Sequence, residues 1–493
     1  MKRSHNQFLP IITVGFVTYF VFYFIFLFIH LDLIPLAWID EIMGLDPALR
    51  YISGKGFTSQ IWPQEGTRNH FMAYLPLQTW FHVIHLKILP FSIYSVRFPW
   101  AFYLLLGTGF MFLGFKKNQL PTWIAVGLCI LLINEKSLFE TTRGVRVEPL
   151  IYLLFAIAFY AKAFSKLHLQ SIAASLLILC HPDVWPLALV LFLDACTEKN
   201  SDSYILKPNV LWAYPILALL SFLWSIDFNL THWLSQFVHQ GSEHAASGGI
   251  LDRLNNHFVL RFWPYYSTQP WVPITIYISL IGSLYQLATR RGTTVGSAVL
   301  LTHFVWFIAL GPFHRYNSIL FFIAIWWFIP YLIRSKSILK KQGIQVAITV
   351  FVILTSADVV ARHYMAYAQH AIRNPYPVLS WLKEELPNED YLLSGHSIGY
   401  YAMDHTLHNG FILANMPPYD YDFSNYKNYF ILGERPIKGL ETIGTYKATY
   451  ANSSNYASKT YATLFLMYTP SKEEYIATLK AMDTASRDEV SAR

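Results

Sequence analysis

Charged residues are scarce in this sequence. They make up only 14% of the 493 residues, whereas an ordinary soluble domain carries about 25%. Hydrophobic residues reach 54% and aromatic residues 17%. A folded chain of this composition has too few polar side chains to cover its apolar ones, so an ordinary soluble protein is excluded.

Cysteine is rare, and internal repeats and low-complexity segments are missing. The three cysteines, Cys129, Cys180 and Cys196, lie within or beside apolar runs, where a thiol behaves as a small core side chain. Neither a disulfide framework nor a zinc site built from cysteines is therefore expected. The formal net charge of +7 fits the basic cytoplasmic loops of a membrane protein, and we expect no nucleic-acid partner.

Long apolar runs are the dominant feature of the chain. The first, Leu9–Leu31, contains no Asp, Glu, Lys or Arg. It is longer than the apolar part of a signal peptide, about 7–15 residues, and no small-x-small cleavage site follows, so we interpret it as a retained span. Runs of about 17–25 apolar residues can cross a bilayer as helices, and about eleven such spans are predicted. They lie near residues 9–31, 96–115, 120–134, 147–164, 169–181, 184–196, 209–226, 271–289, 295–311, 316–333 and 343–361.

Charge asymmetry orients these spans. Short loops rich in Lys and Arg, such as Lys116–Lys117 and Arg334–Lys341, alternate with loops that hold most of the acids. Cytoplasmic loops carry the excess of Lys and Arg, so the N-terminus is predicted to be cytoplasmic and the C-terminus extracytoplasmic. The apolar segment Phe71–Pro90 contains two histidines and Lys87, so it is either an interfacial segment or a further span. We expect a multi-pass protein of the plasma or inner membrane, surrounded by lipid.

Three outer segments are long: Asp32–Arg97, Asp227–Pro270 and Arg362–Arg493. The third alternates strand-like and helix-like runs, which indicates a small α/β domain. We therefore predict a transmembrane domain at residues 1–361 and an extracytoplasmic α/β domain at residues 362–493. The strand-like runs are YLLSG, GFILAN, NYFILG and ATLFLMY, and the helix-like runs are VLSWLKEEL and EEYIATLKAM.

Adjacent carboxylates, Asp40 and Glu41, stand where the chain leaves the first span. One interpretation is a helix start with acids in its first turn. The other is catalytic, because a carboxylate beside low-dielectric surroundings has a raised pKa and can take a proton from a hydroxyl as a general base. Neighbouring side chains on a helix point about 100° apart, so one acid can face a cavity while the other caps the helix or binds a cation.

Together with segments further along, this motif resembles the start of the GT-C glycosyltransferases, integral-membrane enzymes that use polyprenyl- or dolichyl-phosphate sugars. The order, sidedness and number of the spans also resemble the family, and the likeness covers most of the chain up to about Ala361. The matching segments are Asp40-Glu41 with Ala48, Arg50, Tyr51, Gly54 and Gly56; YLPLQTW (Tyr74–Trp80); SVRFPWAF (Ser95–Phe102), where the family has Arg-x-Pro before a span; and TTRGVRVEPL (Thr141–Leu150).

The sequence departs from the family pattern at two points. A lysine often stands beside the family's Pro-Pro-Leu segment, whereas this chain has Ala73-Tyr74, with Arg68 or His70 as candidates to replace it. The eukaryotic His-Pro-Asp-Glu form of the first motif is absent, because Trp38-Ile39 precede the acids. The chain is therefore more similar to the bacterial branch that modifies lipids and proteins, with aminoarabinose- and mannosyltransferase-like members.

Arg143, Arg146 and Glu148 lie where the chain re-enters the membrane. A guanidinium can neutralise a lipid phosphate with a forked pair of hydrogen bonds and stabilise the charge that grows as the sugar leaves. Interfacial snorkelling with a glutamate partner explains the same residues without a function. The resemblance favours function, with Arg146 and Arg143 binding the donor phosphate and Glu148 binding substrate.

Two further turns that are predicted to be extracytoplasmic carry ionisable residues: His181-Pro182-Asp183, and His314-Arg315-Tyr316 after Gly311-Pro312. His181-Pro182-Asp183 interrupts an over-long apolar run, and a tight turn at Pro182 is a sufficient explanation for it. Ionisable groups retained at membrane depth are nevertheless functional candidates. The predicted substrate-binding residues are Arg50, Glu148, His181, Asp183 and His314, and the further phosphate ligand is Arg315.

A metal site is not required by this sequence. The four histidines of the second outer segment follow no standard ligand spacing, so zinc is not expected. Glu41 or Asp183 can coordinate Mg²⁺ or Mn²⁺ through oxygen. The histidines are His232, His239, His244 and His257.

The resemblance implies an inverting membrane glycosyltransferase with a polyprenyl-phosphate monosaccharide as donor. Asp40 would deprotonate the hydroxyl of an extracytoplasmic lipid, glycan or protein acceptor as the lipid phosphate departs. The alternative is a membrane transporter of a lipid-linked or small anionic substrate, although transporters show internal repeats and charges near mid-membrane. A third interpretation, a non-catalytic assembly protein, would tolerate loss of Asp40.

Overall fold

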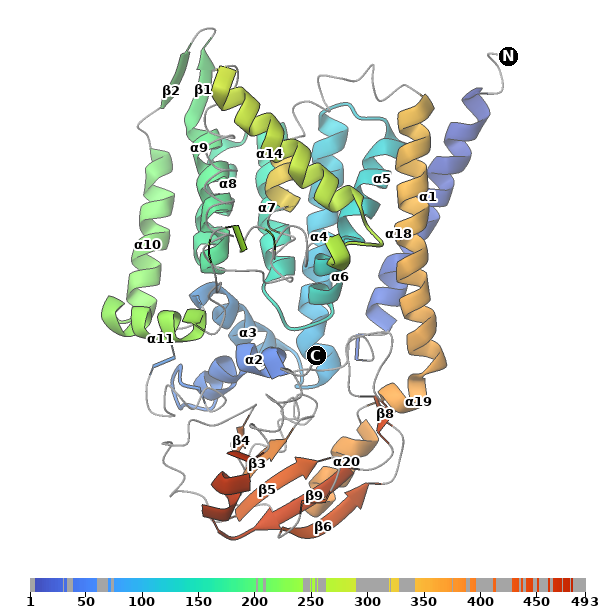
Figure 1. Ribbon diagram of the computed structural model, residues 1–493. Coiled ribbons are helices and arrows are strands. Elements are labelled where there is room, and N and C mark those ends of the chain that lie inside the picture. The colour runs from blue at the N-terminus through green and yellow to red at the C-terminus, as the bar shows by residue number, and fades with distance from the viewer. Residues whose placement is uncertain are drawn as a thin grey trace. The chain divides into compact units, whose positions relative to one another are not determined.

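The computed structural model describes a mostly helical protein (Figure 1). The described residues are 5–29, 31–32, 39–59, 70–71, 75–200, 203–206, 210–242, 249, 251–252, 255, 263–289, 319, 321–327, 342–374, 376–386, 391–395, 411–413, 428–433, 436–437, 440–446, 450–451, 460–461, 464–471, 473–478 and 480–481.

The chain folds into two compact units. The first comprises Met1–Ile29, Met72–Gln78 and Pro99–Ala361, and the second comprises His30–Phe71, Thr79–Phe98 and Arg362–Arg493. The second unit therefore combines the segment after the first span with the C-terminal part of the chain. The division into a transmembrane domain at 1–361 and an extracytoplasmic domain at 362–493 stays a prediction.

Neighbouring helices of the first unit pack against one another along the chain. Helix α8 contacts α7, α9 and α10, and these helices run roughly side by side in Figure 1. Their apolar residues are spread round most of the helix surface, which is typical of helices that are not amphipathic. Their bounds are α7 Glu148–Ala163, α8 Leu167–Ile178, α9 Trp185–Cys196 and α10 Ala213–Ser225.

Helix α4 (Ile93–Lys117) approaches α7 closely within the first unit, and two glycines permit this. A Cβ atom on Gly107 would lie 2.8 Å from the ring of Tyr152, and one on Gly114 would lie 2.6 Å from the ring of Phe159. Both rings are buried. Small residues at helix contacts let backbones approach in this way, which is a recurrent feature of membrane helices.

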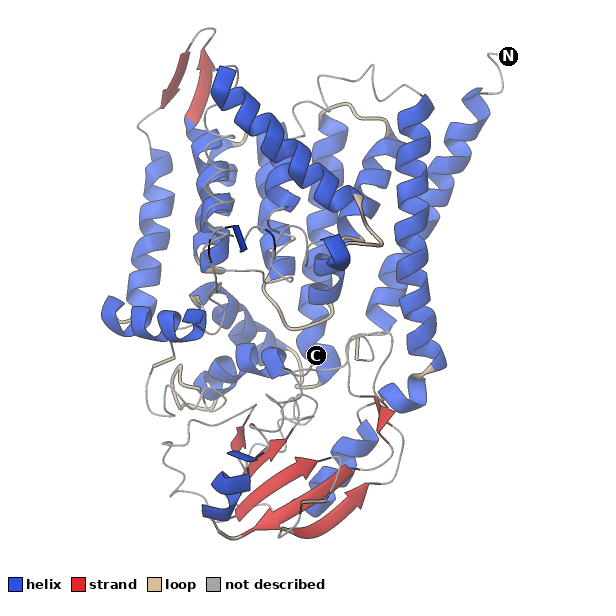
Figure 2. Ribbon diagram, viewed as in Figure 1, coloured by secondary structure: helices blue, strands red, loops and turns tan. Residues whose placement is uncertain are grey.

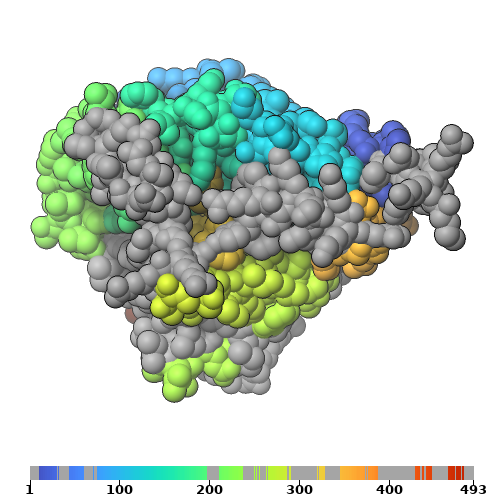
Figure 3. Space-filling view, turned by 90° about the horizontal axis from the view of Figure 1, so that it is seen from above, coloured from blue at the N-terminus to red at the C-terminus, as the bar shows by residue number. Residues whose placement is uncertain are grey.

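Helices α1 (His5–Ile29), α5 (Thr122–Ile133) and α18 (Gln342–Ala368) are held together by polar side chains at Asn134, which follows α5. The Tyr19 hydroxyl donates to Asn134 Oδ1 at 3.0 Å, and Asn134 Nδ2 donates to Thr355 Oγ1 at 3.3 Å. Figure 3, seen from above, shows the dark blue of α1 beside the orange of α18, with the green residues around α10 on the opposite side.

Three of the described helices are long and apolar enough to cross a membrane. They are Pro10–Ile29, Ile93–Lys117 and Gln345–Ala368, and the number rises to five if two bent helix pairs each count as one span. The prediction of about eleven spans is therefore not confirmed by the part of the chain that is described. The predicted span at residues 295–311 lies outside it.

Exposed apolar side chains support placement in lipid. On α10, Leu217 is 58% exposed and Trp224 is 64% exposed, and on α1, Val14 is 65% exposed. Large contiguous apolar surfaces are rare on soluble monomers, and an acyl-chain environment removes the free-energy cost of exposing them.

The helix α11 (Leu230–Ser242) follows α10 after a bend of 79° between the two helix axes.

The C-terminal part of the second unit contains a five-stranded sheet in the order β4-β3-β5-β9-β6 (Figure 2). Strand β3 pairs in parallel with β4 and β5, and β9 pairs antiparallel with β5 and β6. The bounds are β3 Tyr391–Gly395, β4 Phe411–Leu413, β5 Asn428–Gly433, β6 Glu441–Tyr446 and β9 Leu464–Thr469. The four strand-like runs of the sequence coincide with β3, β4, β5 and β9.

One face of this sheet packs on a small apolar core. Tyr429 and Ile431 of β5 and Met467 of β9 are buried together with Tyr475. Helix α20 (Tyr376–Glu385) packs against β6, where the Trp381 ring lies 5.5 Å from that of Tyr446. The location of this sheet outside the cytoplasm stays a prediction.

Candidate functional site

Helix α2 (Ile39–Ile52) begins with the two acids singled out in the sequence. Asp40 lies in its first turn, where the helix dipole favours a negative charge. Glu41 is fully buried. Arg97, in the first turns of α4, donates from Nε to Glu41 Oε2 at 2.9 Å and from Nη2 to Oε1 at 2.6 Å.

The Glu41–Arg97 ion pair is part of a small hydrogen-bond network in the second unit. Arg97 is also fully buried, and its Nη1 donates to the carbonyl of Leu31 at 2.6 Å. The guanidinium therefore ties the end of the first apolar run to the start of α2. Both oxygens of Glu41 accept from this arginine, so the predicted Mg²⁺ or Mn²⁺ ligand is engaged in an ion pair. The sequence pointed to SVRFPWAF only as the approach to a span and missed this role of Arg97.

Arg50 lies at the other end of α2, where the chain turns sharply. Its Nε donates to Thr58 Oγ1. Gly54 and Gly56 have φ angles of 76° and 71°, a left-handed backbone that glycine adopts without strain. These turns fold the segment back on α2, so that Phe57 stacks on Tyr51 with ring centroids 4.2 Å apart.

Arg146 and Glu148 form a second buried ion pair, in the first unit. Arg146 Nη2 lies 2.9 Å from Glu148 Oε1, and Arg146 Nε lies 3.1 Å from the same oxygen. Arg146 is 9% exposed and Glu148 is fully buried. Glu148 begins α7, where the helix dipole stabilises its charge. The pair fixes the guanidinium on a short turn between two helices.

Arg143 lies on the same turn, directly after helix α6 (Lys136–Thr142), for which it is the C-terminal cap. Its side chain is fully buried, and its guanidinium lies over the ring of Phe139, 4.5 Å from the centroid. A desolvated cation over an aromatic face gains about 2 kcal/mol. Phe139 of α6 therefore supports the Arg143 guanidinium.

His181 and Asp183 contact each other in a tight turn after α8. The His181 ring accepts a hydrogen bond at Nδ1 from the backbone N–H of Asp183 at 3.3 Å, and the same atom lies 3.4 Å from Asp183 Oδ2. The two side chains are 17% and 15% exposed. His314 and Arg315 fall outside the described residues.

A cluster that the sequence analysis did not single out lies at the start of α6. Glu135, the N-cap of this helix, is fully buried and accepts a hydrogen bond from the Tyr266 hydroxyl at 2.6 Å. The sequence did not indicate Tyr266 as a functional residue. The sequence feature that could have indicated this cluster is Glu135 itself, an acid that comes directly after a long apolar run.

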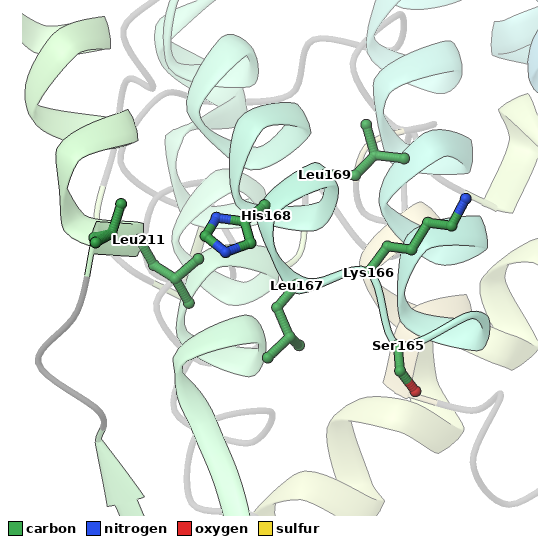
Figure 4. A pocket seen from close by; sticks show the side chains of 7 residues that line it. Ser165, Lys166, Leu167, His168, Leu169 and Leu211 are labelled. Atoms are coloured by element: carbon green, nitrogen blue, oxygen red, sulfur yellow. The ribbon is translucent and has the colours of Figure 1, made fainter.

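An open cavity of about 670 Å³ lies at the turn between α7 and α8. Leu167, Leu169 and Leu211 line it together with His168 and Lys166 (Figure 4). His168 Nδ1 lies 3.1 Å from the Tyr214 hydroxyl. The Lys166 side chain runs away from His168 in Figure 4, and its Nζ lies 5.5 Å from the Tyr160 ring centroid. The cavity therefore does not bring its two basic groups together.

Among the described residues, no group of three or more His, Cys, Asp and Glu side chains is arranged to hold a metal ion. Two buried pairs, Glu41 with Arg97 and Arg146 with Glu148, each join an acid to an arginine. An arginine held by an acid in this way presents N–H donors, which bind anions and not a metal cation.

Comparison with known proteins identifies the fold. The chain is similar to crystal structures of ArnT from Cupriavidus metallidurans, one bound to undecaprenyl phosphate and one in the apo state. The first has a TM-score of 0.57 at 10% identity and covers 92% of this chain and 98% of that chain. The second has a TM-score of 0.51 at 11% identity and covers 94% and 98%. No family model and no curated protein matches the sequence. At this identity the likeness shows that the chain has an ArnT-like fold, and it does not show the branch of the family.

Proposed function

We propose that this chain transfers a monosaccharide from a polyprenyl-phosphate donor to a hydroxyl of an extracytoplasmic lipid, glycan or protein, with inversion. The observation that carries the proposal is the likeness of nearly the whole chain to an ArnT structure that holds undecaprenyl phosphate. The buried arginines beside α6 and α7 support it, because desolvated guanidinium groups suit a phosphate at the membrane edge.

The proposed donor site is built on the turn that joins α6 to α7. Arg146, held in one orientation by Glu148 at 2.9 Å, and Arg143, resting on Phe139, would bind the phosphate. Pre-oriented cations stabilise the charge that develops there as the bond to the sugar breaks. Arg315 is proposed as a further phosphate ligand, and Arg50, His181, Asp183 and His314 as substrate-binding residues.

Asp40 is the proposed general base. Its carboxylate would take the proton of the acceptor hydroxyl while that oxygen attacks the anomeric carbon and the bond to the phosphate oxygen breaks. One displacement leaves the anomeric centre inverted and releases the polyprenyl phosphate. Glu41 is proposed to act beside it by fixing the start of α2 through Arg97. We place the enzyme in the plasma or inner membrane, with the N-terminus cytoplasmic and the C-terminal sheet outside.

Binding of undecaprenyl phosphate tests this donor site. Arg146→Ala and Arg143→Ala are each expected to weaken binding to the purified protein by about tenfold or more, because a charge-assisted hydrogen bond contributes about 1.5–3 kcal/mol. Titration followed by native mass spectrometry measures the bound fraction. Lys166→Ala, which removes an exposed cation of a predicted cytoplasmic loop, is the control and should bind as the wild type does. Equal binding by all four proteins would contradict the assignment.

A further inference from the structure

The start of helix α6 receives hydrogen bonds from a segment more than 120 residues further along the chain. Glu135 accepts from the Tyr266 hydroxyl at 2.6 Å, and from the backbone N–H groups of Ser137 at 3.0 Å and Leu138 at 2.7 Å. The buried carboxyl therefore joins the first turn of α6 to Tyr266.

Gln269 makes a second connection between the same two segments. Its Oε1 accepts from the backbone N–H of Lys136 at 2.9 Å, and its Nε2 donates to the carbonyl of Asn134 at 2.6 Å. Gln269 is fully buried. One amide thus satisfies a donor and an acceptor on either side of Glu135.

These bonds occur where the backbone needs partners. The axes of α5 and α6 differ by 68° across a short break, so the intrahelical hydrogen-bond ladder is interrupted there. The first N–H groups of a helix and the last carbonyls of the one before it have no partner within their own helix. Since buried backbone groups must be paired, the orientation of α6 depends on Glu135, Tyr266 and Gln269.

Two further residues of α6, Lys136 and Glu140, contact Tyr265 in the same segment. Lys136 Nζ donates to the carbonyl of Tyr265 at 3.0 Å and lies 4.2 Å from the centroid of its ring. The Tyr265 hydroxyl donates to Glu140 Oε2 at 3.1 Å. Side chains on successive turns of α6 are therefore attached to the Tyr265–Gln269 segment, which fixes both the position and the rotation of the helix.

The position of Arg143 depends on how α6 is attached. Phe139, which supports its guanidinium at 4.5 Å, belongs to α6, and Arg143 itself ends the helix. A small rotation of α6 moves Phe139 and Arg143 together, whereas Arg146 has its own anchor in Glu148.

We propose that Tyr266 and Gln269 are positioning residues which, through Glu135 and α6, hold Arg143 in place to contact the phosphate of the lipid donor. The inference rests on the proposed function, since it assigns these residues to that donor site. A displacement of about 1 Å at a charged contact is enough to weaken it substantially.

The test measures the affinity of the full chain for undecaprenyl phosphate. Tyr266→Phe removes one hydroxyl and little volume, and Gln269→Met removes both amide bonds at similar size. Each is expected to weaken binding by about tenfold, while hydrogen exchange becomes faster at the amides of Ser137 and Leu138. Tyr152→Phe, which removes an equally buried hydroxyl from α7, should leave the affinity unchanged.

A double-variant measurement separates positioning from general destabilisation. If Tyr266 acts through Arg143, then Tyr266→Phe weakens binding in the wild type but not in an Arg143→Ala background. The same loss in both backgrounds, or wild-type affinity for both single variants, overturns the inference and leaves the donor site intact. A wild-type protein that binds no undecaprenyl phosphate overturns the proposed function and this inference with it.

Discussion

Asp40→Asn is expected to lower the rate of sugar transfer by about 10² to 10⁴-fold, which is the usual contribution of a general base. The amide is nearly isosteric with the carboxylate but cannot accept the proton of the acceptor hydroxyl. Binding of the lipid donor should not change, because its phosphate is assigned to arginines. The measurement is the rate of transfer from a lipid-linked sugar at saturating donor concentration.

Asp227→Asn provides the matched control for this substitution. Asp227 is an exposed residue at the start of a long segment that is predicted to be extracytoplasmic, and its φ of 50° is a conformation that Asn adopts readily. It should transfer sugar at the wild-type rate. An Asp40→Asn protein that also keeps the wild-type rate would remove Asp40 from the mechanism and favour a transporter or a non-catalytic protein.

Arg97→Leu is expected to lower the free energy of unfolding by about 3–5 kcal/mol, because it leaves the Glu41 carboxylate buried without its partner. Both side chains of the pair are fully buried, so solvent cannot replace the lost contact. Thermal unfolding in one detergent, followed by tryptophan fluorescence, should show a clearly lower midpoint. Replacing both members, as Glu41→Gln with Arg97→Met, should recover most of the loss.

An exposed ion pair in the first unit provides the comparison. Lys162 Nζ lies 2.8 Å from Asp194 Oδ1, with the side chains 39% and 28% exposed. Lys162→Ala should cost no more than about 1 kcal/mol, since solvent screens such pairs. Equal costs for the Arg97 and Lys162 variants would contradict the buried, two-point contact between Arg97 and Glu41.

Local features of the site could be predicted from the sequence because short-range rules determine them. A helix that begins at the Asp40–Glu41 acids, a pair between Arg146 and Glu148, and a turn at Pro182 all involve residues within a few positions of one another. The apolar runs likewise predicted a helical membrane protein, because hydropathy is a property of each run taken alone.

Long-range pairs could not be predicted in this way. Glu41 and Arg97 are 56 positions apart, and Glu135 and Tyr266 are 131 apart. Nothing in either local pattern specifies the partner, because tertiary packing brings them together. The sequence therefore did not distinguish Tyr266 from the other aromatic residues, although its hydroxyl contacts a buried carboxyl.

The bend that follows α5 was also not indicated by the apolar pattern. The span predicted at residues 120–134 agrees closely with α5, which ends at Ile133, but the chain then bends by 68° into α6. The bend depends on Glu135 and Gln269, and hydropathy cannot detect a break that distant side chains stabilise.

Native mass spectrometry of the wild-type protein, purified in mild detergent from its own membranes, tests the central claim most directly. We expect a co-purified lipid with the mass of a polyprenyl phosphate or of its glycoside, and a glycoside would identify the sugar. A protein that never retains an isoprenoid phosphate, even when undecaprenyl phosphate is added in excess, would contradict the claim that this chain uses a lipid-phosphate sugar.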